Sequence, residues 1–371
     1  MIRATNQGSP RRDRRGLLIF LIGIFLPAVF LGGCATAPRG RYIQPTPPIQ
    51  AERGPFFAPQ TADDPPLWGI RSGIVLGIHP AIVGFAPRTA GGPRGLLRVG
   101  YEENGRIHFI NFFALSPVTP RGKRGMSELE DSPTDGRPGI LINPYPHDFH
   151  ERVYEWAKRQ PPPLAEAARI QATPNGAGRL AVVLRYEKFH NGARVYLLAT
   201  LRADRPQEIE FQFFTEPDCP PLKMCVLSST FGNLTRLREL LLADRIMNAK
   251  KMWPDYQGNG FAEPFFFPLR ELARNRAGDV IFAARPDEDR PWEGPGFYPH
   301  PRRLTQYFRV PREEVRPDLR GLVNGRFVFW KTTNPVPGGI AFENVALVEP
   351  FHEGARLIYG YADGDPTAGP D

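Results

Sequence analysis

Short segments in which apolar and polar residues alternate recur along this chain, separated by turn residues. The clearest is 208–215, where Ile209, Phe211 and Phe213 alternate with polar side chains, as on a strand with one buried face. Gly (37) and Pro (42) interrupt the chain and leave few helical patterns, while 26 Phe, 11 Tyr and 5 Trp can fill a core. We therefore predict a mostly β protein, a large antiparallel β-sandwich with one or two short helices and long loops.

Two Asn-Gly dipeptides, at residues 104–105 and 191–192, lie between strand-like segments. Asn-Gly favours the tight turns that join antiparallel strands, so each predicts a hairpin. The hairpin strands are predicted at residues 95–101, 107–115, 180–188 and 193–201, and further strands at 73–78, 279–284, 303–310, 326–331, 340–348 and 356–361.

Three other segments are less regular. The Leu and Arg content of residues 233–243 would suit a helix, but its neighbours favour a strand that shows Arg236 and Arg238 on one face. Apolar residues of 148–158 recur at helical spacing, which predicts a short helix. Residues 121–137 are polar and interrupted by Gly and Pro, which predicts a long exposed loop.

Four arginines between residues 11 and 15 precede an apolar stretch, residues 17–31, which leads into Gly32-Gly33-Cys34. At about 15 residues the stretch suits a signal peptide and is short of the roughly 20 needed to span a bilayer. The alternative is a transmembrane anchor with an incidental cysteine. Arg14-Arg15 also leaves open export by the twin-arginine route.

Leu31-Gly32-Gly33-Cys34 resembles the lipobox of bacterial lipoproteins. The resemblance implies cleavage before Cys34 and attachment of acyl chains such as palmitate to this residue, so that the membrane is a partner through the lipid anchor. Two or more acyl chains hold a protein stably on a membrane. Ala35 stands where such proteins can carry Asp, which implies the cell envelope and there the outer membrane.

The sequence divides into a signal peptide (1–33), a Pro-rich tether (34–66), a β-sandwich domain (67–365) and a disordered tail (366–371). Residues 1–33 hold five of the 47 basic and one of the 39 acidic side chains, so the net charge of +8 falls to +4 without them. Nucleic-acid binding needs a clustered basic surface, and the mature sequence offers no basic run; we expect no nucleic-acid partner.

Cys219 and Cys225 are the two cysteines left besides Cys34. Outside the cytoplasm a nearby pair favours a disulfide over a metal site, so we predict a bond between them. The alternative is a pair of buried thiols that point apart.

Two predicted loops, residues 253–261 and 292–298, combine aromatic rings with carboxylate and amide groups, as sugar recognition requires. Rings stack on the apolar faces of sugars, and planar polar groups bind paired hydroxyls. Arginines could add bidentate contacts to an acidic polysaccharide. The alternatives are aromatics that plug the sandwich edge and arginines paired with strand neighbours such as Glu239. The candidate substrate-binding residues are Arg236, Arg238, Trp253, Asp255, Tyr256, Trp292 and Tyr298.

No catalytic residue can be assigned from motifs, because the sequence has no Gly-x-Ser-x-Gly elbow and no His-Glu-x-x-His helix. His147 and His150, and the acidic triplet 287–289, lack the spacing of known metal sites, so no metal or cofactor is predicted. A carboxylate pair for glycoside hydrolysis stays open, since such pairs meet in space.

Residues 342–351 and 354–361 predict two closing strands joined by a short turn. Together with residues 230–242 they resemble the large sandwiches of the galactose mutarotase family, which implies a domain common in carbohydrate-active proteins. That family's catalytic His and Glu have no assignable counterpart here. The resulting hypothesis is a membrane-anchored envelope lipoprotein with a carbohydrate-binding β-sandwich. The alternatives are a polysaccharide lyase or glycoside hydrolase on the same scaffold, or a non-catalytic assembly lipoprotein.

Overall fold

The computed structural model describes residues 44–45, 54–59, 64–78, 94–146, 169–171, 178–230, 236–256, 262–288, 302–327 and 339–368. All of them belong to one compact unit, residues 39–371. The lipobox with Cys34, the predicted helix at 148–158, His147, His150, Trp292 and Tyr298 lie outside the described residues.

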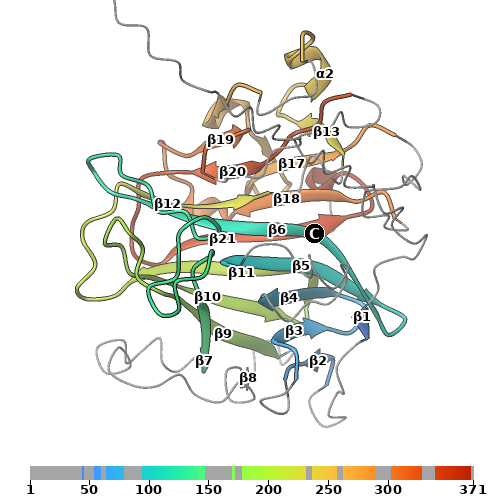
Figure 1. Cartoon of the computed structure of the whole chain (residues 1–371). Coiled ribbons are helices and arrows are strands. Elements are labelled where there is room, and N and C mark those ends of the chain that lie inside the picture. The colour runs from blue at the N-terminus through green and yellow to red at the C-terminus, as the bar shows by residue number, and fades with distance from the viewer. Residues whose placement is uncertain are drawn as a thin grey trace, which may run out of the picture. The chain divides into compact units, whose positions relative to one another are not determined.

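Two large antiparallel sheets contain the described strands, which confirms the predicted β-sandwich class (Figure 1). The first sheet has the order β15 (Phe265–Pro268), β19 (Arg320–Val323), β20 (Val345–Val348), β12 (Met224–Ser229), β6 (Arg106–Val118), β5 (Leu96–Glu103), β4 (Ile74–Ile78), β3 (Leu67–Ile70) and β2 (Phe56–Phe57), and β1 (Gln44–Pro45) pairs with β6.

The second sheet has the order β14 (Ile246–Asn248), β13 (Leu237–Leu241), β17 (Val280–Pro286), β18 (Thr305–Val310), β21 (Ala355–Ala362), β11 (Arg205–Thr215), β10 (Val195–Arg202), β9 (Arg179–Tyr186) and β7 (Ile142–Pro146). Two short strands, β16 (Ala273–Arg274) and β8 (Arg169–Gln171), pair with β17 and β9. Helical turns in the described residues are short: α2 (Ala249–Met252), η4 (Leu269–Glu271), η5 (Arg312–Glu314) and η6 (Pro366–Ala368).

Alternating apolar side chains of both sheets form the main core. Ile209, Phe211 and Phe213 of β11 are buried as their spacing predicts, whereas the polar residues between them face outward. Phe113 of β6 packs edge-on against Tyr359 of β21, with ring centroids 4.7 Å apart, and the two strands belong to opposite sheets. Aromatic contacts across the layer therefore join the two sheets.

The hairpin between β5 and β6 forms as predicted. Glu103 pairs with Arg106, so Asn104 and Gly105 alone make the turn, with φ of 52° and 73°. Positive φ at both central residues is what Asn-Gly supplies at little cost. The second predicted hairpin joins β9 and β10 through residues 187–194.

A buried polar contact links the sheets at the centre of the core. The side-chain amide of Asn111 on β6 donates to Gln306 Oε1 on β18 (2.5 Å), and the hydroxyl of Tyr359 on β21 donates to the same oxygen (2.7 Å). All three residues are buried. Since buried polar groups cost free energy unless they are paired, this contact favours one alignment of the two sheets.

Several sequence predictions need correction. The loop at 121–137 is partly buried, because Ser127 Oγ accepts a hydrogen bond from the β6 backbone at Leu115 (3.0 Å). Residues 340–348 form a strand only from Val345, and β20 and β21 lie in different sheets rather than in one hairpin. The first sheet also extends into the segment assigned to the tether, through β1 and the buried β2.

The predicted disulfide is wrong, since Cys219 and Cys225 are both free thiols. Cys219 Sγ accepts from the Arg194 N–H (3.2 Å) and donates to the Pro220 carbonyl (3.3 Å), so its sulfur is held by the turn backbone. Burial raises the pKa of both thiols, which disfavours the reactive thiolate.

Among the described residues, the helices are too short and polar for any of them to cross a bilayer.

The central polar contact makes a stability prediction. Gln306→Ala leaves the Asn111 amide and the Tyr359 hydroxyl without their shared acceptor, so we expect a loss of about 1–3 kcal/mol in the free energy of unfolding. Urea denaturation measures it. Gln207→Ala, at an exposed position, is the matched control and should change stability by less than about 0.5 kcal/mol. Equal effects of the two variants would contradict the proposed role of Gln306.

Candidate functional site

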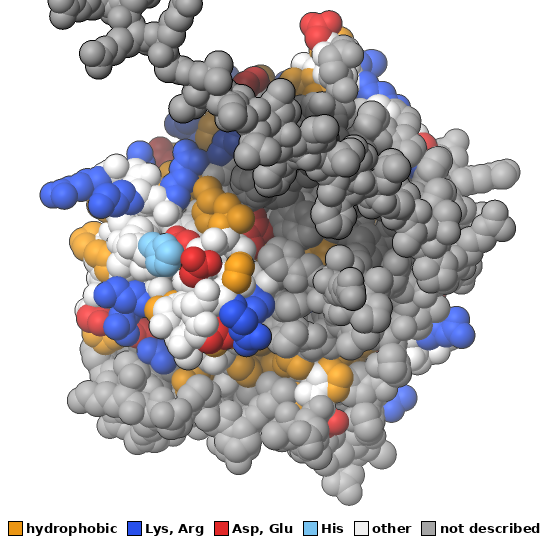
Figure 2. All heavy atoms as spheres, viewed as in Figure 1, with side chains coloured by type: hydrophobic (Ala, Val, Ile, Leu, Met, Phe, Trp, Pro, Cys, Tyr) orange, Lys and Arg blue, Asp and Glu red, His pale blue; other side chains and the backbone are white. Residues whose placement is uncertain are grey.

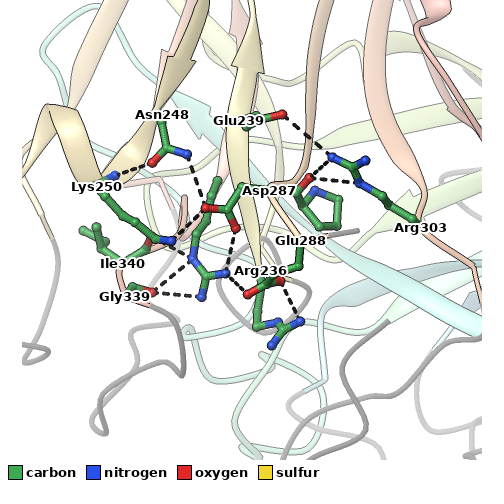
Figure 3. A network of polar contacts seen from close by, with 11 residues as sticks. Arg236, Glu239, Asn248, Lys250, Asp287, Glu288, Arg303, Gly339 and Ile340 are labelled. Carbon is green, nitrogen blue, oxygen red and sulfur yellow. Dashed lines mark hydrogen bonds and ion pairs between the residues drawn. The ribbon is translucent and has the colours of Figure 1, made fainter. Parts of the chain in front are cut away.

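The first sequence-predicted site contains Arg238, whose side chain is fully buried at the edge of the second sheet (Figure 3). Its guanidinium donates to Asp287 Oδ1 (3.1 Å), to Glu288 Oε1 (2.6 Å) and to the Gly339 carbonyl (3.0 Å). A buried guanidinium needs such partners, because an uncompensated charge in the interior is strongly destabilising. Arg238 is therefore part of the fold's interior and offers no face to a polymer.

Arg236 and Lys250 complete this cluster. Arg236, at φ 57° just before β13, pairs with Glu288 (2.6 Å), and burial lowers the pKa of its guanidinium. Lys250 of α2 pairs with Asp287 (2.8 Å). Burial opposes ionisation of Asp287, but hydrogen bonds from Lys250 and Arg238 lower its pKa overall. Three cationic side chains therefore share the two carboxylates of Asp287 and Glu288, and no guanidinium of the cluster is exposed.

The alternative prediction, that Arg236 and Arg238 pair with carboxylates of neighbouring strands, is confirmed. The carboxylates are Asp287 and Glu288 instead of Glu239. Glu239 pairs with Arg285 on the neighbouring β17 (2.8 Å), whereas Asp287 and Glu288, which follow β17, pair with the two predicted arginines. Figure 3 shows Glu239 directed toward Arg303, on the other side of the cluster from Lys250.

The aromatic residues at 253–256 pack against the sandwich edge. Trp253 caps α2 and lies edge-on to Phe342, with ring centroids 6.0 Å apart, and Tyr256 is half-buried against the same core. Burial raises the pKa of the Tyr256 hydroxyl. Asp255 between them is exposed. The structure thus gives both rings a packing role and does not bring them together with an exposed Arg236 or Arg238.

A larger polar groove lies on the outer face of the second sheet. It comprises a cavity of about 860 Å³ and a smaller one of about 220 Å³, which share Arg205, Glu208, Asp279 and Arg309. β11, β18 and β21 form its floor, and η5 and the residues after β21 line its sides. The volume lies in the range of ligand sites, roughly 300–1,000 Å³.

A glycine in β21 allows polar side chains to meet across the groove floor. Gly360 pairs with Tyr307 of β18 on one side and with Glu208 of β11 on the other. A Cβ at Gly360 would lie 2.4 Å from the Tyr307 ring. Without it, Tyr307 crosses the strand and its hydroxyl donates to Glu208 Oε1 (3.0 Å).

Arg309 binds two carboxylates of the groove, those of Glu208 and Asp279. Its Nε and Nη2 donate to the two oxygens of Glu208 (2.9 and 2.6 Å), and its Nη1 donates to Asp279 (2.7 Å). Burial opposes ionisation of Asp279, but hydrogen bonds from the Arg312 backbone, Asn275 and Arg309 lower its pKa. Both carboxylates are held in fixed positions as hydrogen-bond acceptors.

Glu210 behaves differently from these two carboxylates. It lies on the same face of β11, two residues beyond Glu208, and its side chain is 18% exposed. It forms an ion pair with Arg356 Nη1 at 3.7 Å, and Arg356 also pairs with Glu313 (2.9 Å) and Glu314 (2.7 Å). Burial raises the pKa of Glu210, with Glu314 adding to the effect and Arg356 opposing it.

The charges that line the groove are nearly balanced. Most guanidiniums are already paired with carboxylates, which favours an uncharged ligand rich in hydroxyls over an acidic polymer. Elsewhere on the described surface, Figure 2 likewise shows acidic side chains beside Lys and Arg. The groove's charged residues are Arg202, Arg205, Arg276, Arg302, Arg309 and Arg356 against Asp204, Glu208, Glu210, Asp279, Glu313, Asp363 and Asp365.

Sequence reasoning missed this groove as a site. It predicted Glu208, Glu210 and Gln212 only as the polar face of a half-buried strand. The available signal was the acidic residues at alternate positions of one strand, together with Arg309 and Arg356 within the predicted strands at 303–310 and 356–361.

Comparison with known protein families, with curated protein sequences and with solved structures finds no match for this chain. The likenesses to bacterial lipoproteins and to galactose mutarotase sandwiches therefore stay predictions from the sequence. Within the described residues, no three His, Cys, Asp or Glu side chains are grouped so as to hold a metal ion.

The packing of the Tyr307 ring over Gly360 leads to a second prediction. Gly360→Ala places a methyl group against the Tyr307 ring, so the ring must move and its hydrogen bond to Glu208 is lost. We expect a loss of about 1–3 kcal/mol in the free energy of unfolding, measured by urea denaturation. Gly364→Ala, where an added Cβ meets no atom within 4 Å, is the control. If Gly360→Ala were as stable as the control, the described packing would be wrong.

Proposed function

We propose that this protein is a lipid-anchored cell-envelope protein whose β-sandwich binds a carbohydrate polymer in the outer groove of the second sheet. The observation that supports it most is the groove itself, about 860 Å³ in volume and lined by ion-paired carboxylates and guanidiniums. Such groups can bind neighbouring sugar hydroxyls as paired acceptors and donors.

The near balance of acidic and basic side chains in the groove favours an uncharged ligand. A polyanion would need guanidiniums in excess, but Arg309, Arg302 and Arg202 are each paired with a carboxylate of the groove. A neutral polysaccharide adds hydroxyls without a net charge to desolvate. We therefore favour a neutral glycan over the acidic polymer that the sequence suggested.

The anchor in this proposal is Cys34, by its resemblance to a lipobox cysteine. Strand β1 begins ten residues later, at Gln44. A chain of that length spans at most about 35 Å, since each extended residue covers roughly 3.3–3.6 Å. The β1 end of the first sheet would then stay within that distance of the acylated residue.

Polymer binding can be tested at Arg205, which is exposed and borders both cavities. Arg205→Ala removes charge-assisted hydrogen bonds to the glycan, so we expect about tenfold weaker binding. Affinity electrophoresis of the full chain through gels containing neutral polysaccharides measures it. Arg320→Ala is the control, because Arg320 is likewise the exposed first residue of a strand, but in the other sheet. Retardation that both variants retain in full would exclude the groove as the binding site.

Acylation makes a separate prediction. In a bacterial host fed alkyne-tagged palmitate, the native chain should be labelled and sediment with membranes, while Cys34→Ser should lose both properties, because the acyl acceptor is gone. Cys219→Ser is the control and should keep label and location. Persistent labelling of Cys34→Ser, or an unlabelled native chain, would remove the anchor from the proposal.

A further inference from the structure

Exposed apolar side chains gather on two strands of the described structure. Its exposed large apolar side chains, each between 44% and 55% exposed, are Leu129, Ile246, Phe265 and Phe266. Phe265 and Phe266 belong to β15, the last strand of the first sheet, and Ile246 belongs to β14, the last strand of the second. Single exposed apolar residues are ordinary, but a group of them on sheet edges marks a surface that contacts something apolar.

The two edge strands are joined to each other beside these side chains. The Ala243 N–H, in the turn between β13 and β14, donates to the Glu271 carbonyl of η4, the helical turn that follows β15 (N···O 3.0 Å). Arg245 also pairs with Glu271 (2.6 Å). Figure 1 shows β13 and β19, the neighbours of the two edge strands, at the same end of the molecule. We call Ile246, Phe265 and Phe266 together the apolar edge.

The apolar edge suits a soft apolar layer better than an added protein strand. Pro264 precedes β15 and Pro268 ends it, and proline has no N–H to offer an incoming strand. Phe265 and Phe266 follow one another on the strand, so their rings leave it on opposite faces. The headgroup region of a bilayer takes up apolar side chains to a depth of about 5–10 Å and can surround rings on both faces of an edge.

The lipid anchor of the proposed function would hold the apolar edge within reach of the same membrane. β1 lies on the side of β6 that also pairs with β12, because β5 occupies the other side. The register runs from Gln44 opposite Ile107, six residues along β6 to Phe113, and then across Ser229, Val345 and Val323 to Phe265.

That register gives the distance from the start of β1 to the apolar edge. Three strand spacings of about 4.8 Å and six residues of about 3.3 Å make roughly 14 Å across the sheet and 20 Å along it, or about 25 Å in all. The ten residues from Cys34 to Gln44 can span up to about 35 Å. An acylated Cys34 and the apolar edge can therefore contact one bilayer at the same time.

We propose that the apolar edge docks on the lipid bilayer that holds the Cys34 anchor, with its three side chains inserted among the headgroups. This inference rests on the proposed acylation, because three apolar side chains supplement an anchor and do not replace one. Insertion of these side chains, and not charge, drives the contact, since the exposed charges beside β15 and β19 are mixed in sign. They include Arg270, Arg320, Glu263 and Asp318.

Docking in this way fixes the height of the groove above the membrane. The strands of the groove floor, β18, β21 and β11, are three to five positions from β14 in the second sheet. At about 4.8 Å per strand they stand roughly 14–24 Å from the apolar edge. The sandwich then rests on its edge, and its outer groove opens to the side at that height, where a polymer can enter it.

The test uses the acylated full chain, purified from bacterial membranes, in vesicles of phosphatidylcholine, a lipid without net charge. A dye that reports apolar surroundings is attached at one position at a time, through Phe266→Cys on β15 or Ile246→Cys on β14. We expect emission at both positions to move to shorter wavelength and quenching by aqueous iodide to be lost, because the lipid shields the dye.

Leu129→Cys is the matched control, since Leu129 is also an exposed apolar side chain. The neighbouring Glu130 accepts from the His190 N–H in the connection between β9 and β10 (2.6 Å), and β9 lies toward the opposite edge of the second sheet from β14. A dye at 129 should stay open to iodide. The native chain treated in the same way gives the background from Cys219 and Cys225.

The outcomes separate the docking from the anchor. Iodide quenching that persists at 266 or 246 in an acylated chain would overturn the docking and leave the anchor intact. Shielding at 129 equal to that at 266 would overturn it as well. Shielding that is lost when the chain is diluted with lipid would assign the apolar edge to a second copy of the chain instead. A native chain without acyl groups would remove both the anchor and the docking.

Discussion

The register of β21 against β11 and β18 determines which side chains meet on the inner and on the outer face of the second sheet. Tyr359 points inward, where its hydroxyl and the Asn111 amide share Gln306 Oε1 and so join the two sheets. The next residue, Gly360, faces outward and lets Tyr307 reach Glu208 over the strand. A shift by one residue would exchange the two faces, so the interior polar contact and the groove floor depend on the same pairing.

Two charged clusters in this sheet, around Arg238 and around Arg309, differ in how their buried charges are surrounded. Around Arg238 the carboxylates and backbone carbonyls enclose the guanidinium completely, which leaves the charge no contact with solvent. Around Arg309 the pairing is equally close, but one side stays open to the groove. Charge pairing offsets the cost of burial in both clusters, and the cavity beside Arg309 gives a ligand access to the carboxylates there.

Local pattern predicted much of this fold, because strands and turns are determined by neighbouring residues. The alternation of Ile209, Phe211 and Phe213 predicted β11, and Asn104-Gly105 predicted the hairpin turn between β5 and β6. Contacts between distant segments were not predictable in this way. Arg238 meets Glu288 only because β13 and β17 are neighbours, and those residues are 50 positions apart.

The candidate site was less predictable than the fold for the same reason. Glu208 and Glu210 are the same residue type on the same face of one strand, yet they have different charged partners. Those partners, Arg309 and Arg356, come from strands about 100 or more residues further along the chain. For Cys219 and Cys225, proximity in sequence suggested a disulfide that the structure does not contain. Both are free thiols, and Cys219 Sγ is hydrogen-bonded to the backbone.

The rims of the groove are fixed by contacts that reach beyond its own sheet. Arg302 pairs with Asp363 and lies over the rings of Tyr361 and Tyr101, at 5.9 and 5.3 Å from their centroids, and Tyr101 belongs to the first sheet. At the smaller cavity, Arg356 ties β21 to η5 through Glu313 and Glu314. A groove held in this way needs little ordering when a ligand enters, so more of the contact energy is available for affinity.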